Sequence, residues 1–271
     1  MSGWTLTLRR DCPLRLDLRE LSPAALAGRS AAEVERWRLW HGNESLALGE
    51  VFAVSPHDGE ELVFEGDLSR ADRIGWQLAA GVIRVEGPAG DYLGAGMSGG
   101  EILSHGAAGR LAGCEMSGGR LEIGGNTGDF AAASLPGSMD GMRGGVMVVR
   151  GNAGARFGDR MRRGTALVFG DVGDFAASRM VAGTIAVAGR LGAHPAYGMR
   201  RGSLVCAGPA PALPAAFVQS RADIAVFWQL IARDLARHGG ALAALPQRLP
   251  QRHLGDLAAG GKGELLILNP D

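Results

Sequence analysis

The chain has 271 residues, and its 44 glycines far exceed the usual share of about 7%. Lys+Arg and Asp+Glu are both 28, so the net charge is 0, which argues against broad attraction to nucleic acids or anionic membranes. Hydrophobic residues make up 46%, enough for a core, which excludes wholesale disorder. No run of 18 apolar residues occurs, so we expect a cytoplasmic protein without a membrane span.

Residues 1–55 read as an N-terminal cap built from a strand, a helix and a strand. Thr5–Arg9 alternates in the manner of a strand. Ser30–Glu33 has the capping-box form and precedes Val34, which predicts a short helix. Leu46–Val54 is expected to form a second strand that leads into the middle of the chain.

The middle of the chain is a repeat with a period of 19 residues. A second glycine stands six residues after each anchor glycine, and a methionine stands three residues before all but the first. One spacing is longer by seven residues, in the stretch around Ala132–Asp140. The anchors are Gly81, Gly100, Gly119, Gly145, Gly164, Gly183 and Gly202.

Between its two glycines, each unit carries a short alternating segment whose second and fourth positions should face inward. The repeat predicts an all-β fold, a right-handed parallel β-helix of about seven to eight coils over residues 56–211, with small α/β caps at both ends. Glycine would turn the corners, and the methionines would fill the interior. The alternative, an ordinary sheet with glycine turns, leaves the constant period unexplained.

Residues 212–271 read as a C-terminal helix and tail. A proline-rich connection over 209–216 comes first. An apolar stripe in Phe217–Arg237 then predicts a helix, and Leu265–Leu268 predicts a strand.

No residue pattern in this sequence predicts catalysis or a metal site. The three cysteines are scattered, and no two histidines have metal-ligand spacing. Matches to Gly-x-Gly-x-x-Gly lie at repeat corners and in no βαβ unit, so they do not predict a dinucleotide site. Asp91, Asp129 and Asp174 share one repeat position, which predicts that each accepts hydrogen bonds from nearby backbone amides.

Arginines gather in the later repeats, several of them in shared columns. Like charges about 5 Å apart repel unless an anion lies among them. They are therefore candidates for binding a polyanion or an acidic partner, or they are compensated locally by Asp140, Asp159, Asp171 and Asp174. The candidates are Arg143, Arg156, Arg160, Arg162, Arg163, Arg179, Arg200 and Arg201.

The outward positions of the last strands are apolar and need a cover. The cover could be the chain's own helix within 217–237 or a partner subunit. This candidate packing face consists of Val148, Leu167, Phe169, Ala186 and Val205.

Four parts of the sequence resemble known families. The unit Met142–Gly154 resembles the GXGXG repeat of the C-terminal domain of the glutamate synthase large chain. The run Leu48–Phe52, the helix after the last repeat and the ending Arg252–Asp256 with Gly261–Leu266 resemble the C subunit of formylmethanofuran dehydrogenase.

This resemblance implies a non-catalytic scaffold in a formyltransferase/hydrolase complex. In bacteria, such a complex moves a formyl group from formyl-tetrahydromethanopterin to a methanofuran-type carrier and releases formate. The partners would be an amidohydrolase-like A subunit, which holds zinc, together with a B subunit, and a formyltransferase D subunit. This chain would bind no cofactor itself, and whether it counts as an enzyme stays open. Because 27 of its 28 basic residues are arginine, with Lys262 the exception, the bacterial branch is favoured.

Two alternatives to the scaffold remain. The arginines could bind an acidic polyglutamate tail of the carrier, or the chain could be an accessory domain like that of glutamate synthase.

Overall fold

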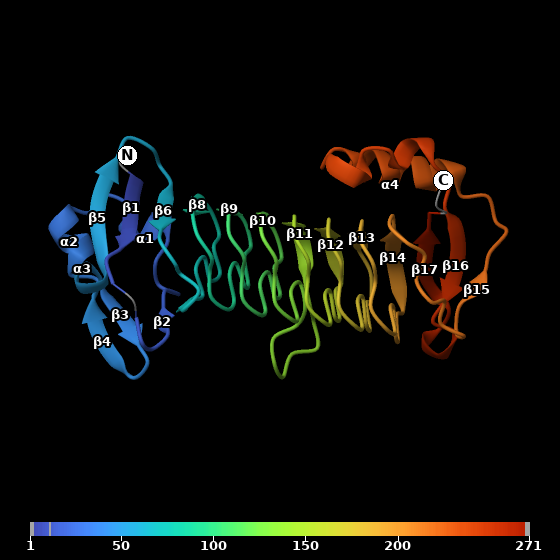
Figure 1. Cartoon of the computed structure of the whole chain (residues 1–271), viewed down its shortest axis with the longest axis horizontal. Helices are drawn as coiled ribbons and strands as arrows, with labels where there is room; N and C mark the ends of the chain where they lie inside the picture. Colours follow the sequence, from blue (N-terminus) through green and yellow to red (C-terminus); the bar gives the residue numbers. More distant parts are fainter. Residues whose placement is uncertain (1–2, 11, 269–271) are drawn as a thin grey trace.

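The computed structural model describes residues 3–10 and 12–268. The molecule is elongated, with the N-terminal segment at one end, the C-terminal strands at the other and a row of strands between them (Figure 1). No helix in the described part of the chain has the length and hydrophobicity needed to cross a membrane.

One sheet of 13 strands runs the length of the molecule, in the order β15-β16-β17-β14-β13-β12-β11-β10-β9-β8-β6-β1-β5. From β17 to β1 in this order, neighbouring strands are parallel. At one end β5 pairs antiparallel with β1, and at the other end β16 pairs antiparallel with both β17 and β15. The strands are β1 (Gly3–Leu8), β5 (Phe52–His57), β6 (Leu62–Glu65), β8 (Val82–Val85), β9 (Glu101–Ser104), β10 (Arg120–Ile123), β11 (Arg143–Val149), β12 (Arg163–Val168), β13 (Thr184–Val187), β14 (Arg201–Cys206), β15 (Val218–Gln219), β16 (Gln251–Gly255) and β17 (Lys262–Ile267).

A second sheet of four strands, in the order β4-β3-β2-β7, lies in the N-terminal part of the chain. Its strands are β2 (Leu16–Asp17), β3 (Arg38–His41), β4 (Glu44–Ala47) and β7 (Ala71–Asp72). The α-helices are α1 (Pro23–Leu26), α2 (Ala31–Glu35), α3 (Leu48–Val51) and α4 (Ala225–Ala236), and short 3-10 helices are η1 (Gly240–Leu242), η2 (Leu245–Gln247) and η3 (Leu257–Ala259).

The core under the long sheet is made of the predicted inward columns. Each repeat places its second-position side chain directly opposite that of the next repeat, as Ile83 opposite Ile102 and Ile185 opposite Leu204. The methionines three residues before the anchor glycines are fully buried, and their unbranched side chains fill the space between successive strands. The predicted burial of both sets is confirmed.

The predicted right-handed parallel β-helix of seven to eight coils is wrong. The structure has one open mixed sheet, and its antiparallel end strands do not belong to the repeat. Only one side of each unit forms a strand; another side makes isolated bridges such as Ala108↔Thr127. The all-β class is right, and the structure is closer to the alternative of a sheet with glycine-rich turns.

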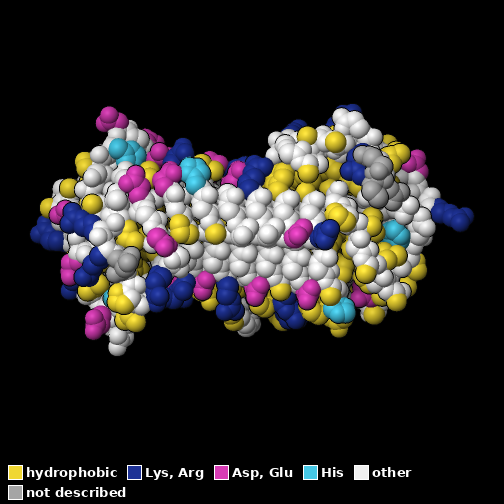
Figure 2. Space-filling view, viewed as in Figure 1, with side chains coloured by type: hydrophobic (Ala, Val, Ile, Leu, Met, Phe, Trp, Pro, Cys, Tyr) yellow, Lys and Arg dark blue, Asp and Glu magenta, His cyan; other side chains and the backbone are white. Residues whose placement is uncertain are grey.

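Backbone conformation explains why the rest of each unit is not strand. Arg156, Phe175 and His194 share one repeat position and all have φ between 56° and 61°, in the left-handed region that interrupts a strand. Gly164 (φ 95°) is the second residue of β12, and an added Cβ there would lie 2.8 Å from the carbonyl oxygen of Gly145. Figure 2 shows the middle of the molecule largely as a white band, the colour of backbone and of uncharged polar side chains.

Aspartate side chains tie successive turns together, as predicted from their shared repeat position. Asp91 Oδ1 accepts a hydrogen bond from the backbone N–H of Arg110 at 2.8 Å. Asp174 Oδ1 accepts one from Ala193 at 2.7 Å. In both cases the amide belongs to the next repeat, so the aspartates join neighbouring units.

Two predicted flanking elements differ from the structure. The strand expected over Leu46–Val54 is interrupted by α3, because the carboxylate of Glu50 accepts a hydrogen bond from Ala47 N–H at 2.8 Å and closes a helical turn. The helix expected within Phe217–Arg237 is α4, which begins only at Ala225 because Val218–Gln219 pair with β16. The capping box at Ser30 and Glu33 is confirmed.

Candidate functional site

Helix α4 covers the apolar outer face of the later strands. Val148, Leu167, Ala186 and Val205 are each fully buried in one cluster with Trp228 of the helix. Ala232 and Leu235 of α4 complete the helical side of this cluster, and Phe169 packs against it half-buried. The chain therefore supplies its own cover for the face that the sequence left open to either a helix or a partner.

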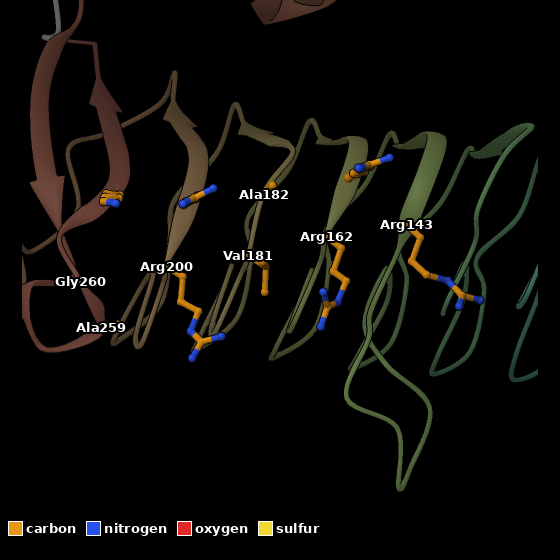
Figure 3. A pocket seen from close by; sticks show the side chains of 10 residues that line it. Arg143, Arg162, Val181, Ala182, Arg200, Ala259 and Gly260 are labelled. Carbon is orange, nitrogen blue, oxygen red and sulfur yellow. The ribbon is translucent and has the colours of Figure 1, made fainter.

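The basic groove is a hollow of about 660 Å³ beside the starts of the later strands. Successive repeats supply its arginines, because the two residues before each anchor glycine occupy the same place in every unit. In Figure 3, Arg143, Arg162 and Arg200 project to the same side, with Val181 between the last two. The groove is lined by Arg143, Arg162, Arg163, Val181, Ala182, Arg200, Arg201, Ala259, Gly260 and Lys262.

Positive charge in the basic groove is poorly compensated. Arg143 lies opposite Arg163 in the β11–β12 pair, and Arg201 lies opposite Lys262 in the β14–β17 pair. Of the six cations, only Arg162 has an acidic partner among the described residues, namely Asp140. Like charges on adjacent strands destabilise a sheet unless an anion separates them, so the groove is suited to a polyanion.

The other predicted arginines lie outside the basic groove. Arg179 donates two hydrogen bonds of 2.9 Å to the carboxylate of Asp159, and Arg160 lies 3.7 Å from the same carboxylate. Arg156 stacks over Phe175 at 4.9 Å. The eight predicted residues thus form two separate sets, and local compensation applies to the second set more than to the first.

Metal-binding and thiol chemistry can be checked directly in the described residues. In the ranges 3–10 and 12–268, no group of three His, Cys, Asp or Glu side chains is placed to hold a metal ion. Burial raises the pKa of Cys206 to about 12, so this thiol is not a nucleophile at neutral pH. The cationic lining of the basic groove can bind anions.

Lys262 is the groove residue that the sequence missed. It lies in the tail, outside the repeat, and becomes a neighbour of Arg201 only because β17 pairs parallel with β14. The sole sequence signal was that this is the only lysine of the chain.

A second exposed feature is the outer side of α4. Val226 is 79% exposed and Leu230 is 69% exposed, one helical turn apart, and Phe227 is 40% exposed beside them. Side chains four residues apart on a helix lie on one face, so α4 is apolar on its outer side as well as its inner side. The outer side of α4 is therefore an exposed apolar face.

Comparison with known proteins gives related subunits of two kinds of complex. No family model matches the chain. The C subunit of the formyltransferase/hydrolase complex Fhc of Methylorubrum extorquens is 44% identical over 89 residues, which are 33% of this chain and 34% of that protein. The C subunit of the tungsten-containing formylmethanofuran dehydrogenase 2 of Methanothermobacter wolfeii is 36% identical over 99 residues, 35% of this chain and 37% of that protein. These matches span about a third of each relative's length.

The comparison with solved structures gives a match over nearly the whole chain. A chain in the crystal structure of the formyltransferase/hydrolase complex (FhcABCD) from Methylorubrum extorquens, in complex with methylofuran, superposes with a TM-score of 0.92 at 43% sequence identity. The match covers 98% of this chain and 100% of that one.

Proposed function

Because this chain belongs to the family of C subunits of formyltransferase/hydrolase and formylmethanofuran dehydrogenase complexes, we propose that it is a non-catalytic structural subunit of such a complex. The assembly would transfer a formyl group from formyl-tetrahydromethanopterin to a methanofuran-type carrier and release formate. Its partners would be an amidohydrolase-like A subunit, a B subunit, and a formyltransferase D subunit.

The observation that carries this proposal is the end-to-end similarity to one chain of a four-subunit complex. Two features of this chain support a structural role. The described residues bring no three metal-ligating side chains together, so the proposal assigns the zinc to another subunit. The outer side of α4 offers exposed apolar side chains that a neighbouring protein can bury.

Purification of the tagged chain from its native cells tests the proposal. We expect three further proteins to co-purify in fixed ratio, with formyltransferase and hydrolase activity in the assembly and none in the isolated chain. A chain that purifies alone, or that hydrolyses formyl carrier by itself, would contradict the structural role. Genes for the formyltransferase and the amidohydrolase next to this one would support it, whereas glutamine amidotransferase genes would favour the glutamate-synthase-like alternative.

The outer side of α4 gives a sharper test of assembly. Val226→Asp combined with Leu230→Asp should reduce co-purification of the partner proteins, because burying two carboxylates in an interface costs several kcal/mol without paired charges. Arg233→Ala is the matched control on the same helix, at an exposed polar position. Unchanged assembly of the double variant would place the contact between subunits elsewhere.

A second candidate function is that the basic groove binds the acidic polyglutamate tail of the carrier. Five cations of the groove have no described acidic partner, and they are spaced along successive strands. Their charge and their regular spacing suit a ligand that carries a row of carboxylates. The relative's structure was determined in complex with methylofuran, which supports a carrier-binding assembly.

Kinetics of the complex test this second candidate. Arg162→Ala and Arg200→Ala should raise the KM for a long-tailed carrier, and Arg200→Ala should have the larger effect because Arg162 already pairs with Asp140. Neither change should alter the KM for a carrier without the tail. Arg190→Ala, outside the groove, is the control with the same loss of charge. An unchanged KM for the long-tailed carrier in the Arg200 variant would rule this function out.

A further inference from the structure

The only irregular step in the repeat produces a loop that the sheet does not need. Glu115 N–H donates to the carbonyl of Ala133, as Arg160 N–H does to that of Ser178, so the regular register holds up to Ala133. It has resumed by Arg143, whose N–H donates to the carbonyl of Met116 as that of Arg162 does to Met142. The extra residues are therefore 134–140, here called the insertion loop. It extends away from the row of strands between β10 and β11 (Figure 1).

The insertion loop is held at both ends. Near its start, Leu135 N–H donates to the carboxylate of Glu115 at 3.2 Å, and the Leu135 side chain packs against a small apolar cluster outside the main core. At its end, Asp140 forms an ion pair with Arg162. Because these contacts hold the loop in place, the space beneath it is formed in advance of any ligand.

That space is a cavity of about 320 Å³, here called the loop cavity. Its size lies at the lower end of the range of about 300–1,000 Å³ typical of small-molecule sites. The apolar side chains lining it include Leu111, Phe130 and Leu135, and the remaining wall is backbone and polar side chains of the insertion loop and of the neighbouring repeats.

Charge in the loop cavity is positive. Arg110, Arg160 and Arg179 line it together with Asp159, so three cations face one carboxylate. Asp159 is only 2% exposed and is already bound by Arg179. The exposed Arg110 side chain has no acidic partner among the described residues, although its backbone N–H is bonded to Asp91. The cavity therefore presents unpaired guanidinium donors next to an apolar wall.

We propose that the loop cavity is a binding site for a small anion that carries a flat apolar ring, such as an aromatic carboxylate or sulfonate. The anionic group would accept hydrogen bonds from Arg110 and from the free donors of Arg179, and the ring would lie against Phe130 and Leu135. This site is separate from the basic groove, and it does not depend on the proposed role of the chain in a complex.

Fluorescence titration of the full chain with 8-anilinonaphthalene-1-sulfonate tests the proposal, because this probe is an aromatic sulfonate. Arg110→Gln should weaken binding about five- to tenfold, the effect of losing one charge-assisted contact. The variant should keep the fold, since the Asp91 bond uses the backbone of residue 110. Ser134→Trp, which fills the cavity from the loop, should abolish this binding.

Arg200→Gln is the matched control, since it removes the same charge from the basic groove. It should bind the probe with wild-type affinity. Absence of probe binding to the wild-type chain would overturn the proposal, as would wild-type affinity in both cavity variants. Equal weakening in Arg110→Gln and Arg200→Gln would also overturn it, because that result would indicate general charge attraction or binding to the exposed side of α4.

Discussion

The early strands β8–β10 and the later strands β11–β14 are built on one repeat but end with different surfaces. Their inward side chains are equally buried in both halves. On the outward side, the third position after the anchor is Arg84, Leu103 and Glu122 in the early strands, where Arg84 pairs with Glu61. In the later strands this position is apolar and lies beneath α4, as Val148, Leu167, Ala186 and Val205. Inward positions thus determine stacking, and outward positions determine what packs on the sheet.

Arg150 lies at the boundary between the two halves. Its guanidinium lies 2.7 Å from Glu122 of the last early strand and donates to the carbonyl of His238, just after α4, at 3.0 Å. It also stacks over Phe169 at 4.6 Å. One side chain therefore links the charged early face to the end of the helix that covers the later face.

The largest expected effect comes from placing an early-type charge in the later face. Leu167→Glu would bury a carboxylate under α4 and should reduce the free energy of unfolding by more than about 4 kcal/mol. Leu103→Glu makes the same change at the same repeat position in the half-buried early face, where we expect about 1 kcal/mol or less. Guanidinium denaturation measures both, and equal losses would contradict the comparison.

The inward methionines should behave alike in the two halves. Met116→Ala in an early unit and Met180→Ala in a later unit each remove a fully buried side chain. Each should cost about 2–5 kcal/mol, because the close-packed interior cannot collapse onto the cavity. Unfolding curves of the two variants provide the test. A loss below about 1 kcal/mol in one of them would mean that the two interiors differ in packing.

A smaller effect is expected at the boundary. Arg150→Ala should cost about 1 kcal/mol, because the side chain is partly exposed and its ion pair is screened by water. Hydrogen exchange of the α4 amides should accelerate in this variant. Arg120→Ala is the control, since Arg120 also pairs with Glu122 but has no described bond to α4 or its following turn. Equal acceleration of hydrogen exchange in both variants would show that Arg150 does not link the early face to the end of α4.

The smallest expected effect is a pH dependence near α4. Burial, with help from nearby Arg120, lowers the pKa of His238 from its ordinary value of 6.5. The folded state therefore binds this proton less readily than the unfolded state, so stability is complete above about pH 6.5 and declines as the pH falls through the lowered pKa. His238→Gln should flatten this part of the stability profile between about pH 7 and 5. An unchanged profile of stability against pH in this variant would show that His238 is not the group responsible.

Much of the local structure could be predicted because the same residue types recur at the same positions in each repeat. The inward columns, the methionines and the aspartate–amide bonds all follow from positions that recur in each unit. The α3 interruption could not be predicted from alternation alone, since it depends on one hydrogen bond from Ala47 N–H to Glu50. The two sets of arginines form one group in the sequence because they lie in the same repeats. They occupy different columns, and the sequence does not tell on which side of a turn each column projects.

By itself, the sequence determined the period, the buried side of each strand and the family resemblance, because these depend on residue spacing and local chemistry. Only the tertiary structure decided that the strands form one open mixed sheet, with end strands contributed by segments outside the repeat. It also decided that α4 covers the later face, that Lys262 joins the basic groove through β17, and that the extra residues line a cavity. These outcomes depend on contacts between residues far apart in the chain, and no local pattern encodes them.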